Sequence, residues 1–310
     1  MSGCTGFVAV VLTLPGLALA GGSLDESSSS NAQETSAEPL YAAPTRLDRI
    51  GRIVAPVTLN GRGPFRFIVD TGANRSVLTT QLANSLGLEA SHENSITLRG
   101  VTGATVVPTV VIDHLKTGDL VQRSLQLPVL DTVMGGADGI LGMEGFEGKR
   151  ITVDFIHDRI EIARSPNLSA PRHYLTLPAR IRFGRLMVID TTVGGVHVKA
   201  IVDTGAERTL GNVALREALL RRRNAGFSEA TQVIGLNLIE EAAHSIRTPP
   251  ITMGGAEIRN VYVVYGDIDV FRLWELEDRP AMLLGMDVLG TLNTLIIDYR
   301  MREVQILTRR

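Results

Sequence analysis

The segment from Phe67 to Thr79 reads FIVDTGANRSVLT, and a close copy of it, AIVDTGAERTL, follows at Ala200–Leu210. In both segments an apolar run typical of a β-strand ends in Asp-Thr-Gly. By average residue usage, such a triplet occurs by chance on the order of 0.1 times in a chain of this length. Two triplets with matching flanks therefore indicate an internal duplication.

The duplication extends well beyond the triplets. With Gly51 placed on Gly184, GRIVAPVTLNGRGPFRFIVDTGA aligns with GRLMVIDTTVGGVHVKAIVDTGA without a gap, and close to half of the aligned positions are identical. The match resumes further along the chain, where GILGMEGFEGKRITVDFIHDRIEI corresponds to LLGMDVLGTLNTLIIDYRMREVQI. We therefore predict two copies of one unit, at residues 46–164 and 173–310. Two copies are too few for an open solenoid, so we expect them to cover each other about an approximate two-fold axis.

Short runs rich in β-branched residues, separated by Gly, Pro, Asn and Asp, fill both copies and predict strands. Only two stretches are typical of helices, one in each copy. The first is SVLTTQLANSLGL, with Ser76 as the expected N-cap and Gly87 as the stop, and the second is NVALREALLRRRNAG, which we expect to close at Gly226. The prediction is an all-β, bilobal fold with an internal pseudo-two-fold duplication and one short helix per lobe.

The first twenty residues, MSGCTGFVAVVLTLPGLALA, combine an apolar stretch with Pro15 and end in Ala-Leu-Ala, which is typical of a cleavable signal. We expect residues 1–20 to be a signal peptide and the mature chain to be secreted or periplasmic. Because this stretch contains no Lys or Arg, membrane tethering by an uncleaved signal stays open as an alternative. Residues 21–45 are rich in Ser, Glu and Ala and poor in large apolar side chains, which predicts a disordered linker.

The composition excludes several partners and chemistries. The 310 residues carry a formal net charge of -2 with a pI near 6.3, which gives no reason to expect a nucleic-acid partner. Cys4 is the only cysteine, so the mature chain would contain neither a disulfide nor a catalytic thiol. The six histidines show no spacing typical of metal ligands, and we expect no metal. No later apolar run is long enough for a membrane span in the mature chain.

Asp70 and Asp203 are the candidate catalytic residues. If both turns lie on the two-fold axis, their carboxyls meet side by side, and like charges about 3 Å apart cannot both ionise near neutral pH. One shared proton leaves a carboxylate that can activate water beside a carboxylic acid that can polarise a carbonyl. Hydrolysis of an amide requires both actions.

The residues that follow each aspartate fit this interpretation. Thr71 and Thr204 offer hydroxyls that could bond across the axis to the opposite turn and hold the carboxyls coplanar. Gly72 and Gly205 allow the sharp turn and leave room for a substrate backbone to approach.

At this point the sequence resembles the aspartic peptidases of the pepsin and retropepsin-like clan, in which Asp-Thr-Gly is followed much later by two apolar residues and Gly. The second element is also present twice, as ILG ending at Gly142 and LLG ending at Gly285. The resemblance covers nearly everything after residue 46 and implies that these strands pack beneath the catalytic turns. It also implies a cleft between the lobes, a peptide or protein substrate in extended conformation and no cofactor. The short motif spacing and the missing cysteines resemble two fused retropepsin units more than pepsin, and we expect a monomer with an internal pseudo-dimer.

Two details of the motifs carry further expectations. Ala73 and Ala206 follow the glycines where pepsins commonly have Ser or Thr, and the missing hydroxyl should leave the pKa values of the dyad higher. We therefore expect activity toward mildly acidic or near-neutral pH. The resemblance also implies a β-hairpin flap, for which Gly100, Val101, Thr102 and Gly103 form the expected mobile tip. The equivalent stretch of the second copy, VIGLNLIEEAAHSIRTPP, is either a second flap or a lobe-specific loop.

Four other residues allow both a functional and a structural interpretation. Asp138 could reach the cleft, although a turn aspartate is the simpler interpretation. Trp274 could line a specificity pocket, but we expect it to be a core or loop anchor. Asn74 and Asn167 both lie in Asn-X-Ser patterns for glycosylation, of which the first is discounted because a glycan there would obstruct the dyad.

Three functions remain open from the sequence. The first is an aspartic endopeptidase, and the second is a non-catalytic module that binds extended peptides on the same fold. The third is a highly selective processing enzyme with little general proteolysis. Retention of both aspartates and both glycine turns favours the chemistry, because binding an extended chain does not require a proton-sharing pair.

Overall fold

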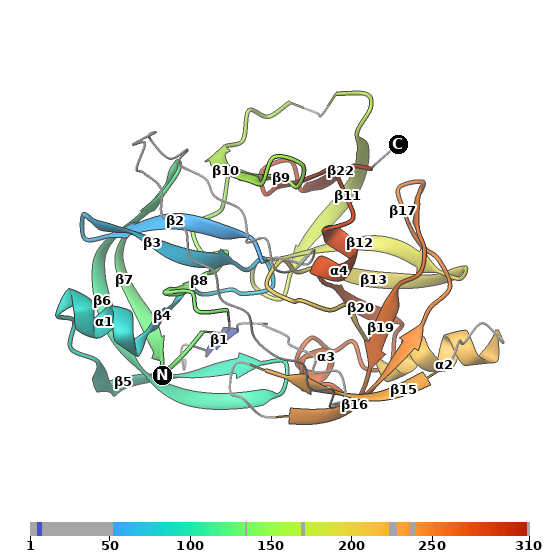
Figure 1. Ribbon diagram of the computed structural model, residues 1–310, viewed down its shortest axis with the longest axis horizontal. Helices are drawn as coiled ribbons and strands as arrows, with labels where there is room; N and C mark the ends of the chain where they lie inside the picture. Colours follow the sequence, from blue (N-terminus) through green and yellow to red (C-terminus); the bar gives the residue numbers. More distant parts are fainter. Residues whose placement is uncertain are drawn as a thin grey trace, which may run out of the picture.

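The computed structural model describes residues 5–7, 52–133, 135–168, 171–222, 228–235 and 240–308. Within these ranges the chain is mostly β-strand, with only short helices, and forms two lobes (Figure 1). The all-β, duplicated fold is therefore confirmed. The boundaries of the two units stay predictions.

The first lobe is a closed barrel. β2 pairs with β3 and β6, β6 pairs with β7, and the circle is completed through β4 and β8. Inward residues alternate along β2, where Ala55, Val57 and Leu59 are fully buried, as a half-buried strand requires. Its elements are β2 (Val54–Leu59), β3 (Arg62–Val69), β4 (Val77–Thr79), α1 (Thr80–Leu86), β5 (Ser91–Gly100), β6 (Gly103–Thr117), β7 (Leu120–Leu130) and β8 (Gly139–Leu141).

The second lobe repeats this order of strands, but the counterparts of β6 and β7 are each divided in two, the latter into β18 and β19. The counterpart of β6 is divided into β16 and β17 at Thr248, Pro249 and Pro250, because proline cannot donate to a ladder. Its elements are β12 (Leu186–Val193), β13 (Val196–Val202), β14 (Leu210–Gly211), α2 (Val213–Arg221), β15 (Ser228–Ile234), β16 (Glu240–Arg247), β17 (Ile251–Met253), β18 (Ala256–Ile258), β19 (Tyr262–Tyr265), α3 (Asp269–Leu273), β20 (Ala281–Leu284) and α4 (Met286–Leu289).

Five strands join the lobes in the order β10, β9, β21, β22 and β11. At the centre β9 pairs antiparallel with β21, and the register opposes Arg150 to Asp298, Thr152 to Ile296 and Asp154 to Thr294. Asp154 and Asp298 occupy equivalent positions in the two copies, so this register maps onto itself when the copies are exchanged. The approximate two-fold axis therefore passes through the central pair, between Thr152 and Ile296. The five strands are β9 (Lys149–Asp154), β10 (Arg159–Arg164), β11 (Leu175–Arg182), β21 (Thr294–Asp298) and β22 (Glu303–Leu307).

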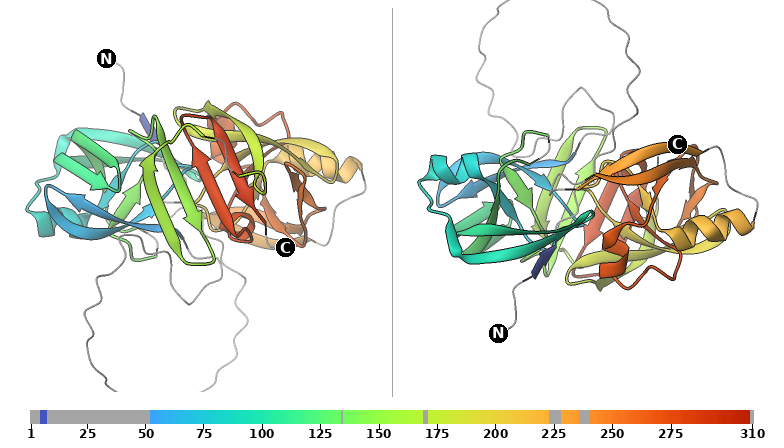
Figure 2. Two further views of the ribbon diagram at one scale, coloured as in Figure 1. Left: turned by 90° about the horizontal axis from the view of Figure 1, so that it is seen from above. Right: turned by 90° about the horizontal axis from the view of Figure 1, so that it is seen from below.

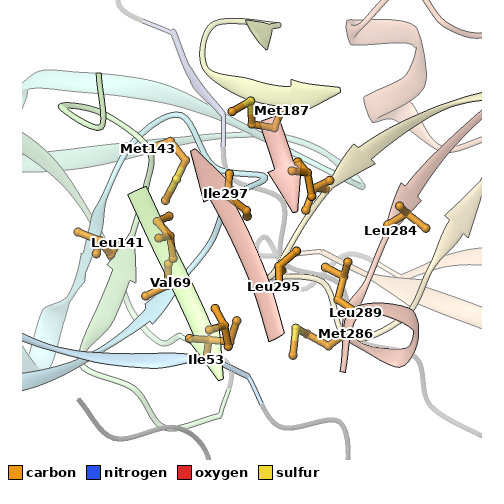
Figure 3. Packing of buried hydrophobic residues seen from close by; sticks show 14 of the residues in the cluster. Ile53, Val69, Leu141, Met143, Met187, Leu284, Met286, Leu289, Leu295 and Ile297 are labelled. Carbon is orange, nitrogen blue, oxygen red and sulfur yellow. The ribbon is translucent and has the colours of Figure 1, made fainter. Parts of the chain in front are cut away.

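The hydrophobic core is continuous between the lobes through this sheet. Figure 2 shows β9, β10, β21 and β22 lying between the two barrels. In Figure 3, Leu295 and Ile297 of β21 lie between Val69 and Leu141 of the first lobe and Leu284 of the second. Burial of this apolar surface is the main term that holds the lobes in one arrangement.

The first helix differs from its prediction at one end. Gly87 ends α1 in the left-handed region at φ 71°, as expected, but the N-cap is Thr79, whose hydroxyl accepts from the Leu82 amide. Ser76 is not a cap, because Val77 and Leu78 pair with β8 and β7 as a strand. The sheet contacts override the helical propensity of this segment.

The second lobe contains more helix than expected. α2 begins after its N-cap Asn212 and its C-cap is Arg222, whereas the expected end at Gly226 lies outside the described residues. α3 and α4 were not predicted, so the expectation of one short helix per lobe is wrong for the second lobe.

Most of the expected signal peptide and all of the expected linker lie outside the described residues. The exception is β1 (Thr5–Phe7), which pairs in parallel with β5 at Thr97–Arg99. No helix in the described ranges is long and apolar enough to cross a membrane.

Candidate active site

Each Asp-Thr-Gly turn begins where a buried strand ends. β3 ends at Val69, and the Asp70 amide donates to the Leu141 carbonyl at 3.0 Å. In the second lobe β13 ends at Val202, and the Asp203 amide donates to the Leu284 carbonyl at the same distance. The two-apolar-plus-Gly segments therefore form the parallel neighbours, β8 and β20, that support the turns.

The two turns are joined by reciprocal threonine bonds. The Thr204 amide donates to the Thr71 hydroxyl at 3.0 Å, and the Thr71 amide donates to the Thr204 hydroxyl at 3.2 Å. Each hydroxyl then donates onward, Thr71 to the Val202 carbonyl at 2.8 Å and Thr204 to the Val69 carbonyl at 2.6 Å. All four bonds are buried and cross the axis, so they fix one turn against the other.

The glycines make room for the opposite carboxyl. A Cβ on Gly72 would collide with the side chain of Asp203, and a Cβ on Gly205 would collide with that of Asp70. The sequence predicted room for a substrate backbone at these positions, whereas the structure places the partner aspartate there. This reciprocity shows that the two aspartates face each other across the axis.

The two carboxyls are buried, and each has a raised pKa. Asp70 Oδ1 accepts from the Gly72 amide at 2.9 Å, whereas Asp203 Oδ1 accepts from the amides of Gly205 at 2.8 Å and Ala206 at 3.1 Å. Burial raises the pKa of Asp203 to about 7. Burial and then the charge of Asp203 raise the pKa of Asp70 well above its usual range. The pair is therefore suited to hold one proton between two carboxyls.

A second layer of bonds supports the glycines that end β8 and β20. The Gly142 amide donates to the Ser76 hydroxyl at 3.0 Å, and the Gly285 amide donates to the Thr209 hydroxyl at 3.1 Å. A Cβ on Gly142 would collide with the backbone of Arg75, and a Cβ on Gly285 would collide with the backbone of Arg208. These hydroxyls stand at equivalent positions of the two copies.

A partly buried carboxylate supports each of these hydroxyl-bearing residues. Glu144 accepts from the Ser76 amide at 2.6 Å, and Asp287 accepts from the Thr209 hydroxyl at 2.6 Å. Burial raises the pKa of both carboxyls. These two residues were not predicted from the sequence, although Glu144 and Asp287 lie two positions after the glycines of equivalent motifs, where a comparison of the copies would find them.

One cation lies near the dyad. Arg52 forms an ion pair with Glu207 of the other lobe at 3.9 Å, and its positive charge acts on both Asp70 and Asp203. The equivalent arginine, Arg185, instead pairs with Glu147 at 3.2 Å on the surface. This asymmetry was also missed, because aligning the copies shows equal arginines but not their different partners.

The residues expected to form the flap make a hairpin, and their role as a flap stays a prediction. β5 and β6 pair up to Gly100 and Gly103, which leaves Val101 and Thr102 as a two-residue tip. The tip was expected to be mobile, but Val101 is 0% and Thr102 2% exposed, because the tip packs against the second lobe. β15 and β16 also pair as an antiparallel hairpin, although its residues 236–239 lie outside the described chain.

The remaining candidates have structural positions. Asp138 accepts from the Arg66 amide at 2.8 Å and fastens a turn, and Trp274 is 3% exposed and stacks on Phe183. The side-chain amide of Asn74 donates to the Phe183 carbonyl at 2.6 Å, which agrees with discounting Asn74 as a glycan site. The pattern at Asn167 extends outside the described residues. In the described ranges no three His, Cys, Asp or Glu side chains are grouped so that they could hold a metal ion.

Comparison with known proteins also indicates that the chain contains two copies of one unit. A family model described as aspartyl protease matches residues 55–144 and again 189–288, which together are more than half of the chain. The two matches agree with two retropepsin-like units, each containing one Asp-Thr-Gly turn. No match was found among curated proteins. The chain therefore belongs to the aspartyl protease family.

Proposed function

We propose that the chain is an aspartic endopeptidase that hydrolyses peptide bonds with a water molecule activated between Asp70 and Asp203. The observation that carries the proposal is the reciprocal fit of the turns, in which each glycine makes room for the carboxyl of the other lobe. Peptide binding alone gives no reason to bury two acidic groups against each other, since burial of a charge is costly.

The hydrogen bonds favour different roles for the two carboxyls. Asp203 Oδ1 accepts from two backbone amides and Asp70 Oδ1 from one, so the negative charge is better stabilised on Asp203. Asp203 would take a proton from water while the water oxygen bonds to the carbonyl carbon. Asp70 would give its proton to the carbonyl oxygen. Collapse of the resulting gem-diol breaks the C–N bond: Asp203 gives its proton to the leaving amine, and Asp70 takes a proton from a gem-diol hydroxyl as the carbonyl re-forms.

The substrate would be an extended peptide between the flap and the dyad. Both catalytic side chains are 0% exposed, so the flap must lift before a peptide can enter. An extended chain in this place could form backbone hydrogen bonds to the flap as an additional strand. The mature protein would act outside the cytoplasm, for which the apolar stretch and Ala-Leu-Ala of residues 1–20 are the support.

A peptide-library digestion tests the function. The unsubstituted chain, Asp70→Asn and Asp203→Asn are incubated with diverse peptides from pH 3 to pH 8, with Asp158→Asn as a control for an exposed turn carboxylate. We expect cleavage by the unsubstituted chain and the control, blocked by a statine-type transition-state mimic, and none by the two dyad variants. Cleavage that survives either dyad substitution would refute the mechanism. Tight peptide binding without cleavage would instead support a binding module. Separately, sequencing the N-terminus of the mature protein tests whether the signal is removed.

A further inference from the structure

The flap tip of the first lobe is held by the second lobe. Tips of two-residue hairpins are usually exposed and mobile, yet the Val101 side chain is fully buried. It belongs to a packed apolar cluster in which every other buried member comes from the second lobe. The equivalent cluster of the first lobe contains first-lobe residues alone among the described chain. Val101 is therefore a first-lobe side chain buried in a cluster of the second lobe. The equivalent tip of the second lobe, at residues 236–239, lies outside the described chain.

An insertion in the second lobe provides the receiving surface. The connection between β19 and β20, residues 266–280, contains α3, whereas the equivalent connection between β7 and β8, residues 131–138, is shorter and has no helix in its described part. α3 packs against the flap strand β5. Insertion 266–280 therefore adds a wall that the first lobe lacks.

Aromatic side chains pack against one another in this wall. Trp274 stacks on Phe183 with ring centroids 5.4 Å apart, and Phe271 meets Trp274 edge-on at 6.1 Å. Phe271 and Trp274 are both nearly fully buried and share the cluster with Val101. Aromatic pairs of this geometry add stability beyond the contribution of their buried surface area. The flap tip thus packs on a surface that contains stacked aromatic side chains.

We propose that insertion 266–280 is a latch for the first-lobe flap, and that Trp274 is a positioning residue that acts through Val101 to hold the flap closed over the dyad. Since the two aspartates are inaccessible in this arrangement, each opening must withdraw Val101 from the cluster. The stability of this contact then sets how often the flap opens. The role of the latch in turnover rests on the proposed peptidase function, whereas the latch itself does not.

The sole tryptophan of the chain reports on the latch directly. Acrylamide quenching of Trp274 fluorescence and hydrogen exchange of residues 96–107 are measured for the full chain, Val101→Ala and Val106→Ala. Val106 lies on the same hairpin but is 69% exposed, so it is a matched control. We expect Val101→Ala to raise the exchange rate of the hairpin roughly tenfold, since it removes two buried methyl groups, and to increase quenching. Val106→Ala should leave both unchanged.

Substitution of the aromatic residue tests the other side of the contact. Trp274→Phe should keep the slow hairpin exchange, whereas Trp274→Ala should match Val101→Ala. If peptides are cleaved, Val101→Ala should raise KM more than it lowers kcat, because closure over the substrate is weakened. Unchanged quenching and exchange in Val101→Ala would overturn the proposal even if the chain is an active peptidase. Faster exchange in a chain without activity would support the latch and refute only the proposed function.

Discussion

Asp203→Asn should stabilise the fold, and the gain should depend on pH. The pKa of Asp203 is raised from 3.8 to about 7, mainly by burial. The native state therefore keeps a proton that the unfolded chain loses between these values, and stability falls as pH rises through this window. Asparagine has nearly the same shape and no charge. The substitution therefore removes the loss at high pH and changes little below pH 4.

The size of the effect follows from the shift. Because one pKa unit corresponds to about 1.4 kcal/mol, a shift from 3.8 to about 7 sets a ceiling of about 4 kcal/mol at pH 8. Urea unfolding at pH 4, 6 and 8 measures the free energy of unfolding of the unsubstituted chain, Asp203→Asn and the exposed control Asp158→Asn. We expect a gain for Asp203→Asn that grows with pH and no such trend for the control. An equal difference at pH 4 and pH 8 would refute the argument that burial of this carboxyl costs stability.

Three further predictions concern the surroundings of the dyad. Thr204→Val should lower the free energy of unfolding by about 2–4 kcal/mol because it orphans the buried Thr71 amide, and Thr204→Ser should restore most of it; equal urea midpoints would contradict this. Arg52→Met should move the alkaline limb of the kcat/KM profile to higher pH, because the Arg52 charge lowers the pKa of Asp70, the proton donor, while Arg185→Met should leave the profile in place. Ala206→Ser should move the acid limb to lower pH, since a hydroxyl beside the carboxylate favours its charged form; an unchanged profile would count against the interpretation of the alanines.

The duplication and the site could be predicted because they depend on short, local patterns. An apolar strand that ends in Asp-Thr-Gly specifies both a buried strand and a turn, and its repetition specifies the partner. The threonine bonds followed from placing Thr71 and Thr204 on one axis, and the structure forms them in both directions. Symmetry thus supplied the long-range contact that a single copy would not indicate.

The predictions that were wrong depend on contacts between residues far apart in the sequence. Ser76 has the chemistry of an N-cap, but its hydroxyl accepts from Gly142 and the next residues pair as a strand. The burial of Val101 depends on insertion 266–280, which lies far away in the sequence and has no equivalent in the first copy. Propensity describes neighbours along the chain, whereas these outcomes were decided by neighbours in space.

Distance from the axis explains which positions of the two copies remain alike. A residue beside the axis meets the motif of the other copy, so a change in Thr71 has to suit Thr204, and a change in Gly72 has to suit Asp203. A residue away from the axis meets a different partner in each lobe, as Arg52 and Arg185 do, and the two copies are free to diverge there. A peptide has no two-fold symmetry, so unequal surroundings on either side of a symmetric dyad allow the protein to bind a substrate in one direction. The differences between the lobes, and not the motif they share, are therefore where substrate preference should be sought.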